Sequence, residues 1–120
     1  EMKTHTNLFV WQKSISLVTL VYRITEHFPD SEKFGLTNQM RRCSVSIPSN
    51  IAEGNARSGD PEFRQFLKIA YGSSAELETQ LVISKELGFI SQADFDTVQE
   101  LLVEIRKMLH VLIIKLTTKS

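Results

Sequence analysis

Gln39-Met40-Arg41-Arg42-Cys43-Ser44-Val45-Ser46-Ile47-Pro48-Ser49-Asn50-Ile51-Ala52-Glu53-Gly54-Asn55-Ala56-Arg57 is the stretch that decides the fold. At about 100° per residue its apolar and small side chains share one helical face, which holds Met40, Cys43, Ile47, Ile51 and Gly54. Polar side chains fall on the adjacent face: Arg42, Ser46, Ser49, Asn50, Glu53 and Arg57. The pattern predicts an amphipathic helix, although Pro48 lies in its middle and an interior proline costs ~3 kcal/mol or more.

Helical periodicity recurs in three further segments, and no strand-like alternation persists anywhere in the chain. We therefore predict four helices, over about residues 7–27, 37–57, 61–87 and 91–117. Short connections between successive helices favour antiparallel neighbours. The sequence thus predicts an all-α, up-down-up-down antiparallel four-helix bundle, formed by one domain over residues 1–120.

Residues that start and stop helices set these boundaries. Gly59 ends the second helix, and we expect Asp60 to cap the third with Pro61 in its first turn. Gly88 is a typical residue after a helix end, and Ser91 is a typical cap for the last helix.

Two of the predicted helices carry more apolar surface than a single bundle core requires. The first helix has two apolar stripes, one through Leu8, Trp11, Ile15, Val18 and Tyr22, the other through Val10, Leu17, Val21, Ile24 and Phe28. The last helix has a heptad seam and further apolar residues beside it. A second stripe indicates a second buried surface, and hence a homo-oligomer.

The 120-residue chain holds 14 basic and 14 acidic residues, a net charge of zero, which argues against a protein dominated by phosphate contacts. The charge is uneven, because residues 60–104 hold three basic and nine acidic residues, a net of −6. Residues 105–120 hold four basic residues and none acidic. This basic end either complements the dipole of the last helix or forms part of a basic patch.

The usual catalytic and metal-binding patterns are missing from the sequence. None of the three histidines has a glutamate three residues before it, so the di-iron site of helical bundles lacks its ligands. The single cysteine, Cys43, excludes an internal disulfide and a cysteine-rich zinc site, and it fits a small core residue. We expect no catalytic residue, cofactor or metal. Without a signal-peptide or membrane-spanning pattern, we expect a cytoplasmic protein that binds no membrane.

A polar network is predicted between the second and third helices. Antiparallel packing through the turn at residues 58–60 brings Arg42 opposite Glu76 and Glu78. The network we predict comprises Arg42, Ser46, Asn50, Glu53, Glu76 and Glu78. Either it fixes helix register or subunit contacts, or it is a patch that contacts a ligand or RNA. An enzyme site built around Arg42, Glu53 and Glu76 is a third, weaker interpretation.

Several stretches of the sequence resemble those of one known protein family. The stretches that carry the resemblance are Trp11, Phe28-Pro29, Phe34-Gly35-Leu36, Gln39-Met40-Arg41-Arg42, Ser46-Ile47-Pro48-Ser49-Asn50-Ile51-Ala52-Glu53-Gly54 and Glu76-Leu77-Glu78. The chain resembles, over nearly its whole length, the 23S rRNA intervening-sequence proteins, which are four-helix bundles also described as ribosomal-protein-like. It is also similar to the accessory proteins of diversity-generating retroelements. The resemblance implies a bacterial, cytoplasmic homo-oligomer, a pentamer.

Two hypotheses for function follow. The first is a non-enzymatic homo-oligomer that binds structured RNA, such as rRNA, or its processing machinery, through cationic residues. The cations that we predict for this role are Lys13, Arg23, Arg106, Lys107 and Lys115. The second is an oligomeric scaffold that holds a protein partner through the acidic segment around residues 76–104 and does not contact nucleic acid.

Overall fold

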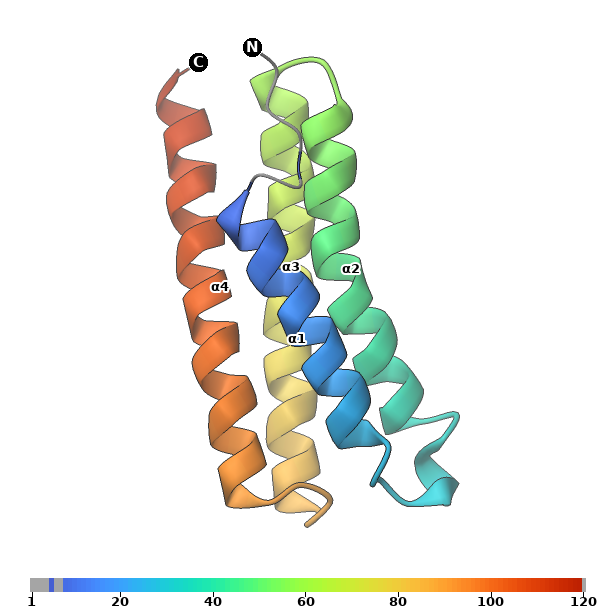
Figure 1. Ribbon diagram of the computed structural model, residues 1–120. Helices are drawn as coiled ribbons and strands as arrows, with labels where there is room; N and C mark the ends of the chain where they lie inside the picture. Colours follow the sequence, from blue (N-terminus) through green and yellow to red (C-terminus); the bar gives the residue numbers. More distant parts are fainter. Residues whose placement is uncertain (1–4, 6–7, 120) are drawn as a thin grey trace.

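Four long antiparallel helices make up the described part of this chain. A computed structural model describes residue 5 and residues 8–119. The helices are α1 (Phe9–Thr25), α2 (Leu36–Ala56), α3 (Asp60–Glu86) and α4 (Gln92–Lys119), and the short 3-10 helix η2 (Asp30–Glu32) lies between α1 and α2. Each long helix packs against the next one along the chain, and α1 also packs against α4 (Figure 1). This is the all-α, up-down-up-down four-helix bundle that the sequence predicts.

The helix boundaries differ from the predicted ones by up to two residues. The predicted start of the first helix at residue 7 lies outside the described residues, and α1 begins at Phe9. Asp60 is the first residue of α3 rather than its cap, because Gly59, with φ of 116°, takes the cap position. A positive φ of this kind strains any residue with a side chain, so glycine suits the position. Two predictions are confirmed: Gly88 has φ of 78°, and the Ser91 Oγ accepts a hydrogen bond from the Asp94 N–H at 3.1 Å.

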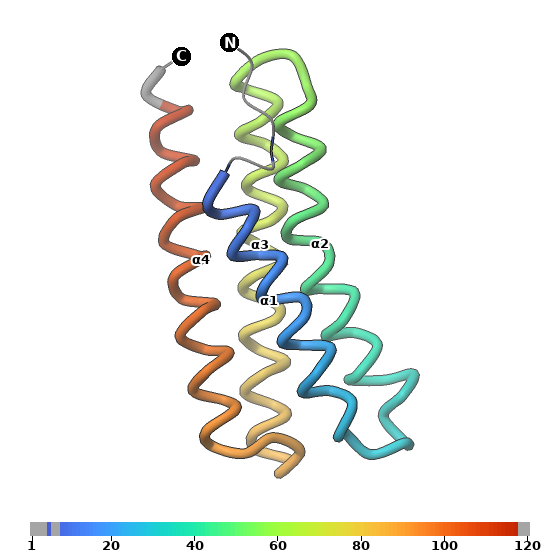
Figure 2. The backbone as a smooth tube through the Cα atoms, viewed as in Figure 1, coloured from blue at the N-terminus to red at the C-terminus, as the bar shows by residue number. Residues whose placement is uncertain are grey.

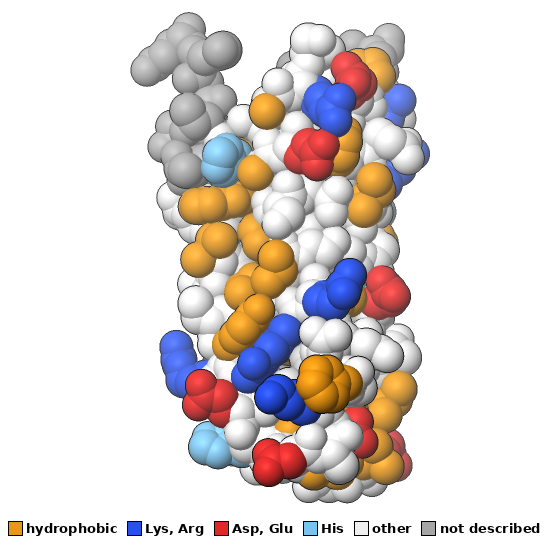
Figure 3. All heavy atoms as spheres, turned by 90° about the vertical axis from the view of Figure 1, so that its right-hand side faces the viewer, with side chains coloured by type: hydrophobic (Ala, Val, Ile, Leu, Met, Phe, Trp, Pro, Cys, Tyr) orange, Lys and Arg blue, Asp and Glu red, His pale blue; other side chains and the backbone are white. Residues whose placement is uncertain are grey.

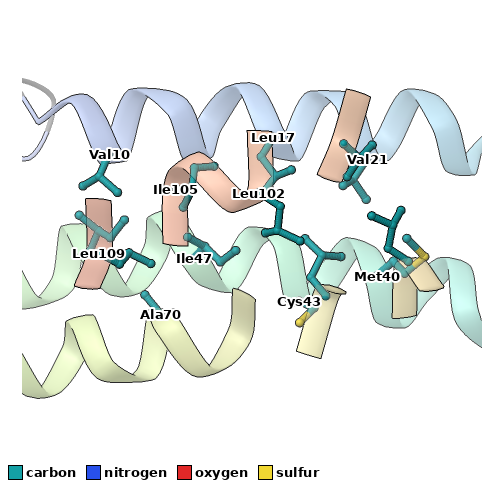
Figure 4. Close-up of a cluster of buried hydrophobic side chains, with 14 of the residues drawn as sticks. Val10, Leu17, Val21, Met40, Cys43, Ile47, Ala70, Leu102, Ile105 and Leu109 are labelled. Carbon is teal, nitrogen blue, oxygen red and sulfur yellow. The ribbon is translucent and has the colours of Figure 1, made fainter. Parts of the chain in front are cut away.

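The core lies along the common axis of the four helices (Figure 4). The α4 heptad contributes Val98, Leu102, Ile105 and Leu109, all at most 1% exposed. The apolar face of α2 contributes its predicted residues, with Ile47 and Ile51 fully buried. Pro48 is also buried, and α2 continues through it as one helix. The helical period of the sequence is therefore sufficient to identify the inward faces.

The close approach of α2 to α3 occurs at Gly54, but not against the predicted partner. We expect from the sequence that Gly54 meets the small residues at 70–75 of the third helix. Instead a Cβ placed on Gly54 would lie 2.6 Å from the Phe66 Cβ and 3.0 Å from the Phe63 Cδ1. The reason is geometric: residues equally distant from the turn at Gly59 meet in an antiparallel pair, and the 70–75 segment lies too far along α3.

Helix length also shapes the surface of the bundle. The first helix has 17 residues, whereas α3 has 27 and α4 has 28. The carboxyl-terminal part of α4 therefore extends beyond the first turn of α1 (Figure 2). At the level of the first residues of α1, the α4 side chain of Val111 lines a cavity with Phe9 and Val10 and is 58% exposed.

Candidate functional site

A polar cavity of about 310 Å³ opens between α2 and α3. Its lining comes from two turns of each helix: Gln39, Arg42, Cys43, Ser46, Ser73, Glu76 and Gln80. The helical period explains the set, because residues spaced by three and four share a face. Three of the six residues of the predicted network, Arg42, Ser46 and Glu76, line this cavity.

Side chains in the inner part of the cavity form hydrogen bonds with one another and with backbone carbonyls. The Ser46 and Ser73 hydroxyls lie 2.8 Å apart and form a hydrogen bond. The Asn50 amide donates to the Ser46 carbonyl at 2.7 Å and to the Ser46 Oγ at 3.0 Å, so Asn50 supports Ser46 from behind. The Cys43 thiol donates to the Ser73 carbonyl at 3.0 Å. These contacts link α2 to α3 and fix the hydroxyls that line the cavity.

The outer part of the cavity holds polar groups that do not pair with one another. Arg42 and Glu76 have opposite charges and line the same cavity, yet no ion pair within 4.0 Å joins them among the described residues. The side-chain oxygen of Gln80 is buried and has no hydrogen-bond partner within the described part of the chain. Buried acceptors are normally satisfied, and leaving one unpaired costs about 1–3 kcal/mol.

Cys43 is not suited to nucleophilic chemistry. Burial, together with the nearby Glu76 carboxylate, raises the pKa of the Cys43 thiol to about 11. The thiol is therefore protonated at neutral pH, whereas the thiolate is the nucleophilic form.

The remaining residues of the predicted network lie elsewhere. Glu53 forms an exposed ion pair with Arg57 at 2.8 Å, one turn away on α2. Glu78 pairs with Arg106 of α4 at 3.0 Å and accepts a hydrogen bond from the Gln99 amide at 2.9 Å. The expectation that Arg42 faces Glu78 is thus wrong. Glu76 and Glu78 are two positions apart, so their directions around the axis of α3 differ by about 200°, and Glu78 is directed toward α4 instead of α2.

The five cations predicted for nucleic-acid binding do not form one surface. Lys13 pairs with Glu104 at 3.3 Å across the α1–α4 contact. Arg106 pairs with Glu78, donates to the Ser74 Oγ at 3.1 Å and stacks on the Tyr71 ring at 4.8 Å, so its guanidinium is engaged within the bundle. The other three cations, Arg23, Lys107 and Lys115, are exposed.

Position along the bundle separates these exposed cations. Arg23 is in the last turn of α1, whereas Lys107 and Lys115 belong to the carboxyl-terminal half of α4, toward the opposite end of the bundle (Figure 1). Lys107 and Lys115 line one apolar cavity of about 470 Å³ beside the start of α1. The candidate cationic surface therefore reduces to this part of α4.

An apolar groove of about 280 Å³ runs between α1 and α2. Its lining is largely apolar: His5, Trp11, Ile15, Val18, Val45, Pro48, Ser49 and Ala52. Figure 3 shows apolar side chains gathered in an oblique band on this side of the molecule. The two predicted stripes of α1 thus lie in different environments. The stripe with Leu17 is buried in the core, and the stripe with Ile15, 39% exposed, lies at the surface.

Sequence reasoning missed part of both sites. It did not single out Gln39, Ser73 or Gln80 for the polar cavity, nor Val45 for the apolar groove. The helical period was the available signal, because Gln39 lies three residues before Arg42 and Gln80 four residues after Glu76.

Comparison with known proteins identifies the family of this chain. The model of the 23S rRNA-intervening sequence proteins matches residues 6–111. The chain belongs to the 23S rRNA-intervening sequence protein family. A solved structure of a family member with this fold comes from Bacteroides thetaiotaomicron and is described as a protein with unknown function from the S23 ribosomal protein family. The two chains superpose with a TM-score of 0.78 at 23% identity, over 87% of this chain and 97% of the other. No curated protein matches this intervening-sequence protein.

Two kinds of feature are absent from the described residues. No helix there combines the length and apolar character needed to cross a membrane. No group of three or more histidine, cysteine, aspartate or glutamate side chains there is arranged to hold a metal ion.

Proposed function

We propose that this intervening-sequence protein is a non-enzymatic homo-oligomer, a pentamer, that binds structured RNA or the machinery that processes it. The observation that carries the proposal is the groove between α1 and α2, an apolar surface that the bundle core leaves uncovered. The family description, which names an insertion in 23S rRNA, supports RNA as the class of ligand.

Assembly through the α1–α2 groove would bury a surface typical of subunit contacts. Trp11 is half-buried at the groove, and aromatic side chains often anchor interfaces. Ile15 and Val45, from the two helices, are 39% and 38% exposed. Burying this apolar surface would contribute to association at roughly 25 cal/mol per Å² before the cost of ordering the partners.

RNA binding is assigned to the carboxyl-terminal part of α4. Lys107 and Lys115 are eight residues apart with Val111 between them, so the three lie along one side of the helix. The last carboxylate on α4 is Glu104, which leaves the remainder of the helix basic. One subunit offers few cations, but repetition in an oligomer raises the effective concentration of each site and strengthens a weak contact.

Charge reversal tests the RNA surface. The variant Lys107→Glu with Lys115→Glu is compared with Lys33→Glu with Lys85→Glu, which makes the same change of charge at the opposite end of the bundle. We expect only the first pair to lose affinity for bacterial rRNA fragments, and the dependence of affinity on salt to become shallower by about one unit of slope per lost phosphate contact. Equal affinity of both double variants would refute the assignment.

A second experiment tests assembly. Light scattering measures the mass of Ile15→Asp, which places a charge in the groove, and of Ser16→Asp, which places the same charge one residue away on the same helix. We expect a multiple of the 13.7 kDa chain mass for the wild type and for Ser16→Asp, and a smaller species for Ile15→Asp. A monomeric wild type would refute the proposal.

The ion pairs favour a second candidate function. Lys13 and Arg106 are held by Glu104 and Glu78, so two of the five predicted cations are partly neutralised. Less cationic charge is then available for phosphate groups, which favours an oligomeric scaffold that holds a protein partner without contacting nucleic acid. Purification from the native host distinguishes the two: RNA that is lost on nuclease treatment supports the first function, and a stoichiometric protein supports the second.

A further inference from the structure

The polar cavity between α2 and α3 holds an arginine and a glutamate that do not pair with each other. Arg42 makes no hydrogen bond or ion pair that the structure shows among the described residues, and Glu76 accepts only a long contact of 3.9 Å from the Cys43 thiol. The buried Gln80 side-chain oxygen has no hydrogen-bond partner in residues 8–119 either. The cavity therefore presents donors from Arg42 and acceptors from Glu76 and Gln80, with space of about 310 Å³ between the two helices.

We propose that this cavity binds a guanine base, with the Glu76 carboxylate accepting from N1–H and N2–H and the Arg42 guanidinium donating to O6 and N7. The proposal rests on the RNA-binding function above and names the base that the protein reads. Unpaired bases in RNA are commonly recognised through these two edges, and bidentate arginine contacts to O6 and N7 are the commonest specific contact to guanine.

The donor and acceptor pattern selects guanine among the four bases. A carboxylate accepts two hydrogen bonds side by side, and guanine alone has two adjacent donors on its Watson–Crick edge. Adenine and cytosine each offer one donor beside an acceptor, and uracil offers one donor between two acceptors. The buried Gln80 oxygen adds one more acceptor, which suits the second hydrogen of the exocyclic amino group.

The fixed inner part of the cavity limits what the ligand can contact. The Ser46 and Ser73 hydroxyls are bonded to each other, and the Cys43 thiol donates to the Ser73 carbonyl. The groups left to bind a ligand are therefore charged or amide groups near the opening. A planar base that enters edge-on meets these groups, and its sugar and phosphate stay outside. Both a free guanine nucleotide and an unpaired guanine of an RNA loop meet this requirement.

The test uses two RNA hairpins that differ in one loop base, guanine or adenine, and the mononucleotides GMP and AMP. Fluorescence anisotropy of the labelled hairpins and calorimetry of the nucleotides measure affinity for the wild type and for Glu76→Gln. The matched control is Glu86→Gln, which removes the same charge from an exposed position of α3 outside the cavity. Circular dichroism and light scattering verify that each variant keeps its helices and its mass.

We expect the wild type to prefer the guanine hairpin by about tenfold or more, the discrimination typical of one bidentate contact. Glu76→Gln should lose this preference, because the amide replaces one acceptor with a donor, and Glu86→Gln should keep it. Equal affinity of the wild type for guanine and adenine, in the hairpins and in the nucleotides, would overturn the proposal. So would a Glu76→Gln variant that keeps the wild-type preference.

The two sources of the base and the two proposals remain distinguishable. Preference for GMP over AMP without binding of either hairpin assigns the cavity to a free nucleotide and refutes the RNA function. Binding of both hairpins with equal affinity, still sensitive to Lys107→Glu with Lys115→Glu, supports the RNA function and refutes the guanine site.

Discussion

Replacing Gly54 by alanine tests how closely α2 and α3 pack. In an open helix position this change stabilises by about 1 kcal/mol, because alanine has the higher helix propensity. At Gly54, however, the new Cβ would lie 2.6 Å from the Phe66 Cβ. The Phe66 Cβ is attached directly to the α3 backbone, so no change of rotamer moves it away. The helices themselves must separate.

The expected magnitude follows from these two opposing effects. Overpacking a well-packed site costs typically about 1–3 kcal/mol, and the short contact places Gly54→Ala near the upper end. Subtracting the gain of about 1 kcal/mol in helix propensity leaves a net loss of about 2 kcal/mol. The contacts at 3.0 Å to the Phe63 Cδ1 and 3.3 Å to the Phe63 carbonyl oppose relaxation toward that side.

Gly72 supplies the matched control, because a Cβ at this α3 position would meet none of the described residues within 4 Å. Gly72→Ala should raise the free energy of unfolding by about 0.5–1 kcal/mol. Urea unfolding followed by circular dichroism, at one fixed protein concentration, measures both variants. The two changes should have opposite signs, and a Gly54→Ala variant as stable as Gly72→Ala would refute the reasoning.

Three further predictions concern the core, the α3–α4 ion pair and the buried thiol. Ile47→Ala should lower the free energy of unfolding by about 2–5 kcal/mol in urea unfolding, because the side chain is 0% exposed, and a loss below 1 kcal/mol would contradict its place in the core. Arg106→Ala should lower the thermal midpoint more than Lys107→Ala, since Arg106 contacts Glu78, Ser74 and Tyr71, and equal midpoints would show that these contacts add nothing. The pKa of the Cys43 thiol is raised to about 11 in the folded protein, whereas it is about 8.5 in the unfolded chain. The contribution of the protonated thiol to stability is therefore fully present below about pH 8.5 and is lost as the pH rises through about 11. The unfolding free energy of the wild type minus that of Cys43→Ala should therefore decrease as the pH rises from about 9 to about 11. Parallel pH profiles of the two proteins would contradict this.

Features that depend on neighbours along the chain were predictable from the sequence. The two stripes of α1, the heptad of α4 and the buried face of α2 follow from a helical period of about 3.6 residues. Gly88 adopts a positive φ, and the Ser91 side chain caps α4. Both roles depend only on residues nearby in the chain, so they could also be predicted from the sequence. Asp60 was misplaced by one residue because glycine at a cap position competes with a side-chain cap.

The partners of charged residues were not predictable in the same way. Glu76 and Glu78 are two residues apart, and their distance along the chain from the turn at residues 58–60 predicts that both lie opposite Arg42. In the structure Glu76 lines the polar cavity, whereas Glu78 pairs with Arg106 of α4. A cation counted as available from composition can likewise be engaged, as Lys13 is by Glu104. Such pairings depend on the rotation of each helix about its axis and on which helix lies beside it.

The sequence by itself determined that this chain forms four helices, which faces turn inward, and that α1 carries apolar surface beyond the needs of the core. Periodicity and local caps set these properties, and both act over a few residues. The tertiary structure alone decided that Gly54 meets Phe66, and that Arg42 and Glu76 line one cavity without an ion pair between them. It also decided that Lys107 of α4 is exposed, whereas Arg106 of the same helix pairs with Glu78 of α3. These outcomes depend on contacts between residues 12 or more apart, whose register is fixed only when all four helices pack together.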